Sequence, residues 1–186
     1  MVLLVAGLLL WSVAHLFVAV APYRRKKLMA RMGVGPYKGC FALTIIASIV
    51  LMVFGWRGTQ PELLYLLPGW VRYITFLFCF VTFILFVAAQ VKTNIKRVLR
   101  HPQLTGLVFW STGHLLANGD SRSLVLFLGL LIWAKLQIIA TNKRDGERVK
   151  PEAVAARNDI LTLFGGTVVF AIFLFAHPYI TGVALW

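Results

Sequence analysis

Long apolar runs are the feature that most constrains the fold of this chain. Five runs are long enough to cross the hydrocarbon core of a bilayer, which is about 30 Å thick. They lie at about residues 2–21, 40–57, 70–91, 122–140 and 160–181. Of the 186 residues, 60% are hydrophobic and only 13% are charged, a balance that excludes an ordinary soluble domain. The sequence therefore predicts an all-α integral membrane protein with a single domain, residues 1–186.

Two further stretches complete the expected outline. Residues 102–117 form a sixth apolar run, which is short, since 16 helical residues span only about 24 Å at about 1.5 Å per residue. We expect this run to be a sixth span packed inside a six-helix transmembrane bundle. The segment 32–39 is rich in glycine and proline and predicts a turn before the second span.

Basic residues alternate between the two sides of this predicted bundle. Alternate connections hold 15 of the 19 Lys and Arg residues, and the connections between them hold three. Because basic loops stay in the cytoplasm, we expect these connections there and both termini on the extracytoplasmic side. The net charge of +13 is then a topology signal. It indicates the lipid bilayer as partner and no binding of nucleic acid.

A short motif occurs twice in the chain. Residues 7–16 read GLLLWSVAHL and residues 106–115 read GLVFWSTGHL, so Gly, Leu, Trp, Ser, His and Leu recur 99 residues apart. The copies fall in the first and fourth spans, which cross the membrane in opposite directions. This arrangement is typical of inverted repeats about an axis in the membrane plane. The sequence therefore predicts a 3+3 inverted repeat.

His15 and His114, one in each copy, are the candidate metal ligands. Neither has a charged neighbour in its run, and an ionisable residue at membrane depth is by default a functional candidate. Two imidazoles that approach the midplane from opposite sides suit axial ligation of one haem b. The predicted cofactor site also contains the serines and tryptophans of the motif: Ser12, Ser111, Trp11 and Trp110. The serines could either bond an imidazole N–H and so orient the ring, or bond their own backbone. An interhelical hydrogen bond between polar side chains is the alternative that these residues leave open.

His101 is a further candidate for the site. It directly precedes Pro102, which suits the first turn of a helix, and lies near Arg97 and Arg100. One interpretation is an exposed histidine that caps the helix. The other is a proton donor or an anion contact at the mouth of the cofactor site.

The quoted motifs resemble a known family. HPQLTGLVFWSTGHLLANGD, GPYKGCFALTIIASIVLMVFGW and the AHL of the first span are similar to the NnrU family of bacterial membrane proteins, over about residues 1–145. The resemblance implies a multi-pass protein of the bacterial inner membrane that serves redox or nitric-oxide and denitrification-linked metabolism. The same core is similar to 15-cis-zeta-carotene isomerase, a membrane enzyme with haem b. That similarity implies axial ligation by His15 and His114, and it matches His101 to the histidine of the isomerase's RHPQ motif.

Three functions remain open from the sequence, and it does not decide whether the chain is an enzyme. The first is a haem b protein that works with a membrane redox partner. The second is a haem-dependent isomerase that acts on a hydrophobic small molecule such as zeta-carotene. The chain has Ser111 where the isomerase motif carries a cysteine. The third is a cofactor-free assembly or scaffold protein.

Overall fold

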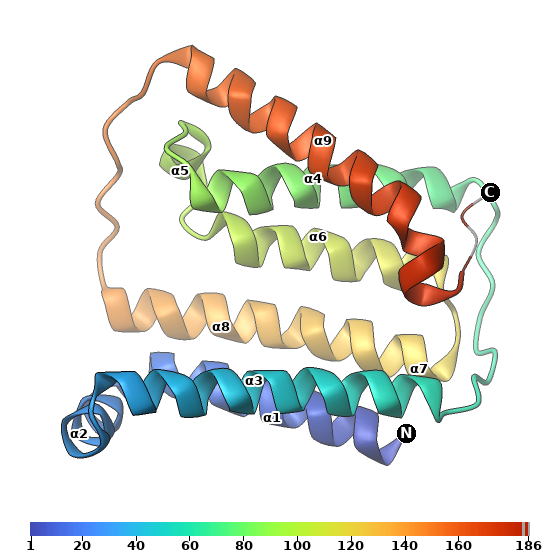
Figure 1. Cartoon of the computed structure of the whole chain (residues 1–186). Coiled ribbons are helices and arrows are strands. Elements are labelled where there is room, and N and C mark those ends of the chain that lie inside the picture. The colour runs from blue at the N-terminus through green and yellow to red at the C-terminus, as the bar shows by residue number, and fades with distance from the viewer. Residues whose placement is uncertain (184, 186) are drawn as a thin grey trace.

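The computed structural model describes residues 1–183 and 185, and these residues form helices with short connections (Figure 1). Within this part of the chain no strand is present, and one isolated antiparallel bridge joins Leu63 to Asp120. A π-helical turn, Leu124–Leu128, leads into α8. The α-helices are α1 (Val2–Val20), α2 (Pro22–Met32), α3 (Val34–Arg57), α4 (Val71–Gln90), α5 (Ile95–Val98), α6 (Pro102–Ala117), α7 (Ser121–Ser123), α8 (Gly129–Asp145) and α9 (Ala156–Thr181).

Among the described residues, five helical stretches are long and apolar enough to cross a membrane. They are α1, α3, α4, the continuous stretch Ser121–Asp145 and α9. This finding confirms a multi-pass, all-α membrane protein. The short helix α6 covers the 16 residues expected for it. Its crossing of the membrane, and with it the count of six spans, stays a prediction.

The second span differs from its expected outline. The sequence predicts a turn over 32–39, yet α3 already begins at Val34, and only Gly33, with φ of +87°, interrupts the helical path. Pro36 falls in the first turn of α3, where its missing N–H is not needed. The basic run before Gly33 forms the 11-residue helix α2, which starts at Pro22 for the same reason.

The long helices are arranged in two pairs, with α8 between them and α9 at one side (Figure 1). α1 lies along α3, and α4 lies along α6. α8 packs against both α1 and α6, whereas α9 packs on α4. The connections 21–33, 91–101 and 143–157 gather at one end of the helices, which we call the basic end. The start of α1 and the last turn of α9 lie at the opposite end (Figure 1).

Glycines let α1 and α3 approach until their backbones touch. A Cβ atom added to Gly55 would lie 2.2 Å from the backbone nitrogen of Leu4. A Cβ atom added to Gly7 would lie 2.7 Å from the carbonyl oxygen of Ser48. Small residues at helix contacts are typical of membrane bundles, where close packing replaces the hydrophobic effect as the force between helices.

Two interhelical hydrogen bonds join α4 to α6. Thr75 Oγ1 donates to the carbonyl of Gly113, and Thr82 Oγ1 donates to the carbonyl of Gly106, each at 2.9 Å. The two bonds are seven residues apart on both helices, so they fix the antiparallel register over two turns. They hold α6, the helix that carries His114, against α4.

The C-terminal end of α6 is closed by the loop before α4. The hydroxyl of Tyr65 donates to the carbonyl of Leu115 and, at 3.2 Å, to that of Asn118. Burial, reinforced by nearby Asp120, raises the pKa of Tyr65, which keeps its hydroxyl protonated as a donor. Asp120 also caps α7 and lies 3.6 Å from Arg122. The turn just beyond His114 is therefore fixed from two sides.

Candidate functional site

The two motif copies form the same arrangement around their histidines. His15 Nδ1 lies 2.9 Å from the carbonyl oxygen of Trp11, and His114 Nδ1 lies 2.9 Å from that of Trp110. A carbonyl oxygen only accepts hydrogen bonds, so in each ring Nδ1 carries the proton and Nε2 keeps its lone pair. Neither Nε2 atom has a hydrogen-bond partner among the described residues. Both are therefore available as metal ligands or as acceptors.

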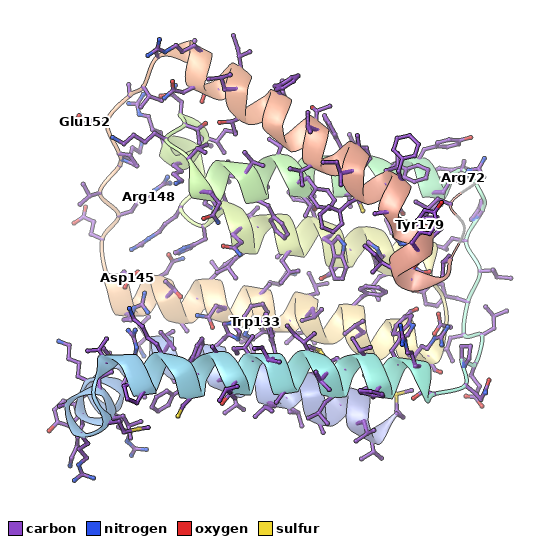
Figure 2. All side chains as sticks on the ribbon, in the orientation of Figure 1. Arg72, Trp133, Asp145, Arg148, Glu152 and Tyr179 are labelled. Carbon is purple, nitrogen blue, oxygen red and sulfur yellow. The ribbon has the colours of Figure 1, made fainter. Side chains whose placement is uncertain are left out.

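His15 lies among aromatic rings from three helices. Its ring centroid is 4.2 Å from that of Trp11 in α1, 5.6 Å from Phe41 in α3 and 5.2 Å from Trp133 in α8. Trp133 is buried and lies within the bundle, between the charged ends (Figure 2). The sequence did not identify Phe41 or Trp133, because nothing in their own segments marks them and only packing brings them to His15.

His114 has a matching but smaller set of ring contacts. Its centroid is 4.4 Å from Trp110 and 4.7 Å from Phe127. Phe127 belongs to the π-helical turn before α8 and also lies 5.1 Å from Trp110 and 6.1 Å from Trp56 at the end of α3. Such π-helical turns are frequent at functional sites. No pattern in the sequence indicates this turn or a role for Phe127.

The serines of the motif do not orient the imidazoles. Ser12 Oγ donates to the carbonyl of Leu8 at 2.7 Å, within its own helix. Ser111 is fully buried, and its hydroxyl has no partner in the described part of the chain. The orienting role that the sequence suggested for Ser12 and Ser111 is taken by the carbonyls of Trp11 and Trp110. One helical turn brings each carbonyl within reach of Nδ1.

His15 also borders a cavity of about 250 Å³ towards the basic end. Arg25 and Lys38 contribute positive charge to its lining, and Tyr37 lies 5.8 Å beneath the Arg25 guanidinium. Arg25 Nε and Gln137 Oε1 are buried and have no hydrogen-bond partner among residues 1–183 and 185. The cavity therefore places cationic and polar groups in the same lining as His15.

The two histidines lie towards opposite ends of the bundle. His15 comes five residues before the end of α1 at the basic end, and His114 three residues before the opposite end of α6. Their ring partners Trp133 and Phe127 are six residues apart, roughly 9 Å at the α-helical rise of about 1.5 Å per residue. No ring contact joins His15 to His114 within the described residues.

His101 stands apart from both motif histidines. It is the N-cap residue of α6, so most of the length of that helix separates it from His114. Its Nε2 lies 2.9 Å from Asn142 Oδ1 in α8. It lines a second cavity at the basic end, and that lining does not include His15.

The donor chemistry of the two motif histidines fits a haem iron. Each imidazole is held by an N–H bond to a backbone carbonyl and leaves the other nitrogen free, as metal-ligating histidines do. Among the described residues no group of three or more His, Cys, Asp or Glu side chains could hold a metal ion. A haem iron needs only two protein ligands, because the porphyrin supplies the other four.

Comparison with known proteins gives one match. A family model described as "NnrU protein" matches residues 3–185, nearly the whole chain. No curated protein and no solved structure matches significantly. The match extends past residue 145, where the resemblance of the quoted motifs ends, and includes α9.

Proposed function

The chain belongs to the NnrU family, and from this premise we propose that it binds haem b through His15 and His114. The proposed role is redox or nitric-oxide-linked metabolism in a bacterial inner membrane. One observation carries the proposal: the duplicated Trp–His pair presents two neutral imidazoles with Nε2 free, on helices that run in opposite directions.

The surroundings of the two histidines support the proposal. Trp11, Trp110 and Trp133 supply the flat apolar side chains that bury a porphyrin ring. Arg25 and Lys38, in the cavity beside His15, would bind the propionates through charge-assisted hydrogen bonds. The buried and unpaired Arg25 Nε is a donor without an acceptor, which a carboxylate would satisfy.

Haem b, when bound, would supply one-electron redox chemistry. The aromatic rings around each imidazole would exclude water, and the carbonyls of Trp11 and Trp110 would keep the imidazoles neutral and correctly oriented. With both histidines as ligands, no iron position stays open. The isomerase is expected to share this ligation, so the preference for electron exchange over isomerisation of a polyene rests on Ser111, which stands where the isomerase motif has a cysteine.

The absorption spectrum of the full chain, expressed with haem supplied and purified in mild detergent, tests the proposal. We expect one haem per chain and the sharp reduced bands of a six-coordinate, low-spin iron. His15→Ala and His114→Ala should each give high-spin or easily lost haem. His101→Ala is the matched control, since His101 lies at the start of α6 and its Nε2 faces Asn142 in α8 instead of either motif, and it should keep the wild-type spectrum.

Stoichiometry decides whether the two histidines share one iron. The ring partners Phe127 and Trp133 are offset by roughly 9 Å along the continuous helical stretch Ser121–Asp145, which makes this measurement necessary. Two haems per chain, each removed by one variant, would mean that each histidine binds its own. A haem-free chain would refute the proposal and favour the cofactor-free scaffold, as would equal haem loss in all three variants.

A further inference from the structure

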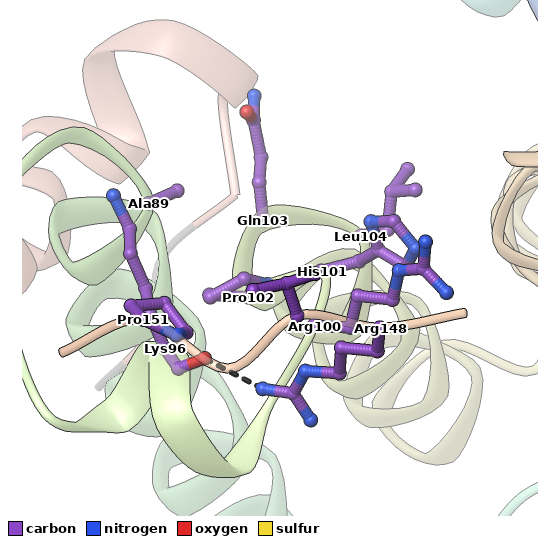
Figure 3. Close-up of a pocket in the computed structure, with 10 residues that line it drawn as sticks. Ala89, Lys96, Arg100, His101, Pro102, Gln103, Leu104, Arg148 and Pro151 are labelled. Atoms are coloured by element: carbon purple, nitrogen blue, oxygen red, sulfur yellow. Dashed lines mark hydrogen bonds between the residues drawn. The ribbon is translucent and has the colours of Figure 1, made fainter. Parts of the chain in front are cut away.

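A second cavity lies at the basic end, where α4, α5, the start of α6 and the connection after α8 meet (Figure 3). Its volume is about 420 Å³, within the range of about 300–1,000 Å³ typical of small-molecule sites. It is separate from the cavity at His15, and the haem proposal does not use it.

The charge of this cavity is entirely positive. Lys96, Arg100 and Arg148 line it together with His101, and no Asp or Glu is among its lining residues. Lys96 and Arg100 come from the connection between α4 and α6, whereas Arg148 comes from the connection after α8. Three cations around one cavity repel one another, so an anion there would relieve this repulsion.

Backbone carbonyls hold two of these cations in place. Arg148 donates to the carbonyl of Lys96 at 2.6 Å, as Figure 3 shows, and to that of Val98 at 2.8 Å. Arg100 donates to the carbonyl of Gly146 at 2.8 Å. A carbonyl satisfies a donor and leaves its charge uncompensated. The guanidinium groups are thus fixed before a ligand arrives, which lowers the entropy lost on binding.

One neighbouring carboxylate, Asp145, lies within electrostatic reach of Arg100 and His101 and offsets part of the cavity's charge, although its direct contacts are made elsewhere. Asp145, at the end of α8, is engaged by Arg144, whose Nε and Nη2 lie 2.6 and 3.1 Å from its two oxygens. His101 Nε2 faces Asn142, which is uncharged. The side chain of Lys96 has no hydrogen-bond or ion-pair partner among the described residues. It is therefore the cation most available to a ligand.

We propose that this cavity binds a phosphate group, presented by the headgroup of an anionic phospholipid. The charge asymmetry of the chain predicts that the basic end faces the cytoplasmic leaflet, where anionic lipids gather, and basic pockets between membrane helices there bind such headgroups. Ala89, Leu104 and Val149 lie in the same lining and suit the apolar part of a lipid. A soluble phosphate compound has the same anionic group but no acyl chains to contact these apolar residues.

Lys96→Gln and Arg97→Gln test the site as a matched pair. The two residues are neighbours in α5 and each variant removes one positive charge, yet only Lys96 lines the cavity, and Arg97 is exposed. Native mass spectrometry of the delipidated full chain would measure binding of phosphatidylglycerol and of phosphatidylcholine. We expect wild type to prefer phosphatidylglycerol. Lys96→Gln should weaken this binding about fivefold, which corresponds to about 1 kcal/mol per basic residue near the surface, and Arg97→Gln should not change it.

Inorganic phosphate forms the second arm of the experiment. If millimolar phosphate raises the melting temperature of wild type and not of Lys96→Gln, and phosphatidylglycerol binds no better than phosphatidylcholine, the site binds a soluble phosphate compound. Equal weakening in both variants would overturn the proposal and indicate diffuse surface charge. Binding of neither probe by wild type would also overturn it. Circular dichroism of each variant without ligand checks that the fold is intact.

Discussion

The carbonyl four residues before each motif histidine determines which imidazole nitrogen carries the proton. A charged imidazole at membrane depth would be costly, roughly 2.5–3.5 kcal/mol on the scale of other fully charged side chains. A neutral ring with its proton on Nδ1 satisfies the Trp carbonyl and leaves Nε2 as the only reactive atom. The same helical geometry therefore orients His15 and His114 and prepares both of them as ligands.

The residues of the motif could be predicted, and their neighbours could not. A tryptophan four positions before a histidine on a helix must lie on the same face, so the Trp11–His15 and Trp110–His114 pairs follow from spacing. Phe41 and Trp133 reach His15 from other helices. Such contacts depend on how helices pack, for which local spacing carries no information.

His101→Ala should leave the haem content of the protein at the wild-type level. His101 precedes His114 by 13 residues along α6, roughly 20 Å at about 1.5 Å per residue, and bonds Asn142 instead of either motif. Haem stoichiometry of the purified variant measures this directly. A loss equal to that of His114→Ala would show that the ligands are wrongly assigned.

Asp159→Ala should lower the melting temperature of the protein. The Asp159 carboxylate near the start of α9 accepts from Thr93 Oγ1 at 2.5 Å, from Asn94 N at 2.8 Å and from Asn94 Nδ2 at 2.7 Å. It thereby ties α9 to the start of α5. Thermal unfolding in detergent checks this, with Glu152→Ala as the control because Glu152 is exposed in the connection before α9. Equal melting temperatures for the two variants would mean that the hydrogen bonds of Asp159 to Thr93 and Asn94 do not stabilise the protein.

At the scale of elements, helix ends were predictable where apolar and polar residues change sharply. α1 ends within a residue of its expected limit, just before Pro22, and α6 begins at Pro102 as expected. The start of α3 and the helix α2 were missed. The glycines and prolines in 32–39 predicted a turn. However, proline fits the first turn of a helix, and a single glycine at positive φ is enough to end one helix and let the next begin, so α2 and α3 follow each other directly.

Gly55→Ala should destabilise the contact between α1 and α3. Its Cβ atom would lie 2.2 Å from the backbone nitrogen of Leu4, and a backbone atom cannot turn aside as a side chain can. We expect a loss of about 1–3 kcal/mol or more, the range of overpacked cores, measured by thermal or denaturant unfolding in detergent.

Gly35→Ala is the control for this substitution. Gly35 lies in the same helix and has nothing within 4 Å of the added Cβ atom, so alanine should be neutral or slightly stabilising through its higher helix propensity. If Gly55→Ala had the stability of the wild type, α1 and α3 could move apart to accommodate the methyl group without loss of free energy.

At the scale of the whole molecule, the sequence predicted membrane helices and left their packing undetermined. Helices in lipid are apolar on every side, so periodicity does not reveal which face meets a neighbour. The pairing of α1 with α3 and of α4 with α6 is determined by small residues and threonines at the contacts.

The duplicated motif marks one such contact in each pair, at Gly7 in α1 and at Gly106 in α6. The opposite directions of its two copies are seen in α1 and α6 (Figure 1), whereas a full 3+3 repeat stays a prediction.

The topology of the chain is the prediction that belongs to the molecule as a whole. Reporter fusions after Lys27, Arg97 and Arg148 should read cytoplasmic, because they follow the basic connections, and fusions after Pro61 and Gly119 should read extracytoplasmic. The loop after Pro61 donates two backbone hydrogen bonds to the Gly119 carbonyl, so these two fusions must report the same side. A cytoplasmic signal at Gly119 alone would contradict that contact. It would also remove α6 as a membrane crossing, and His15 and His114 would then no longer lie on oppositely directed spans.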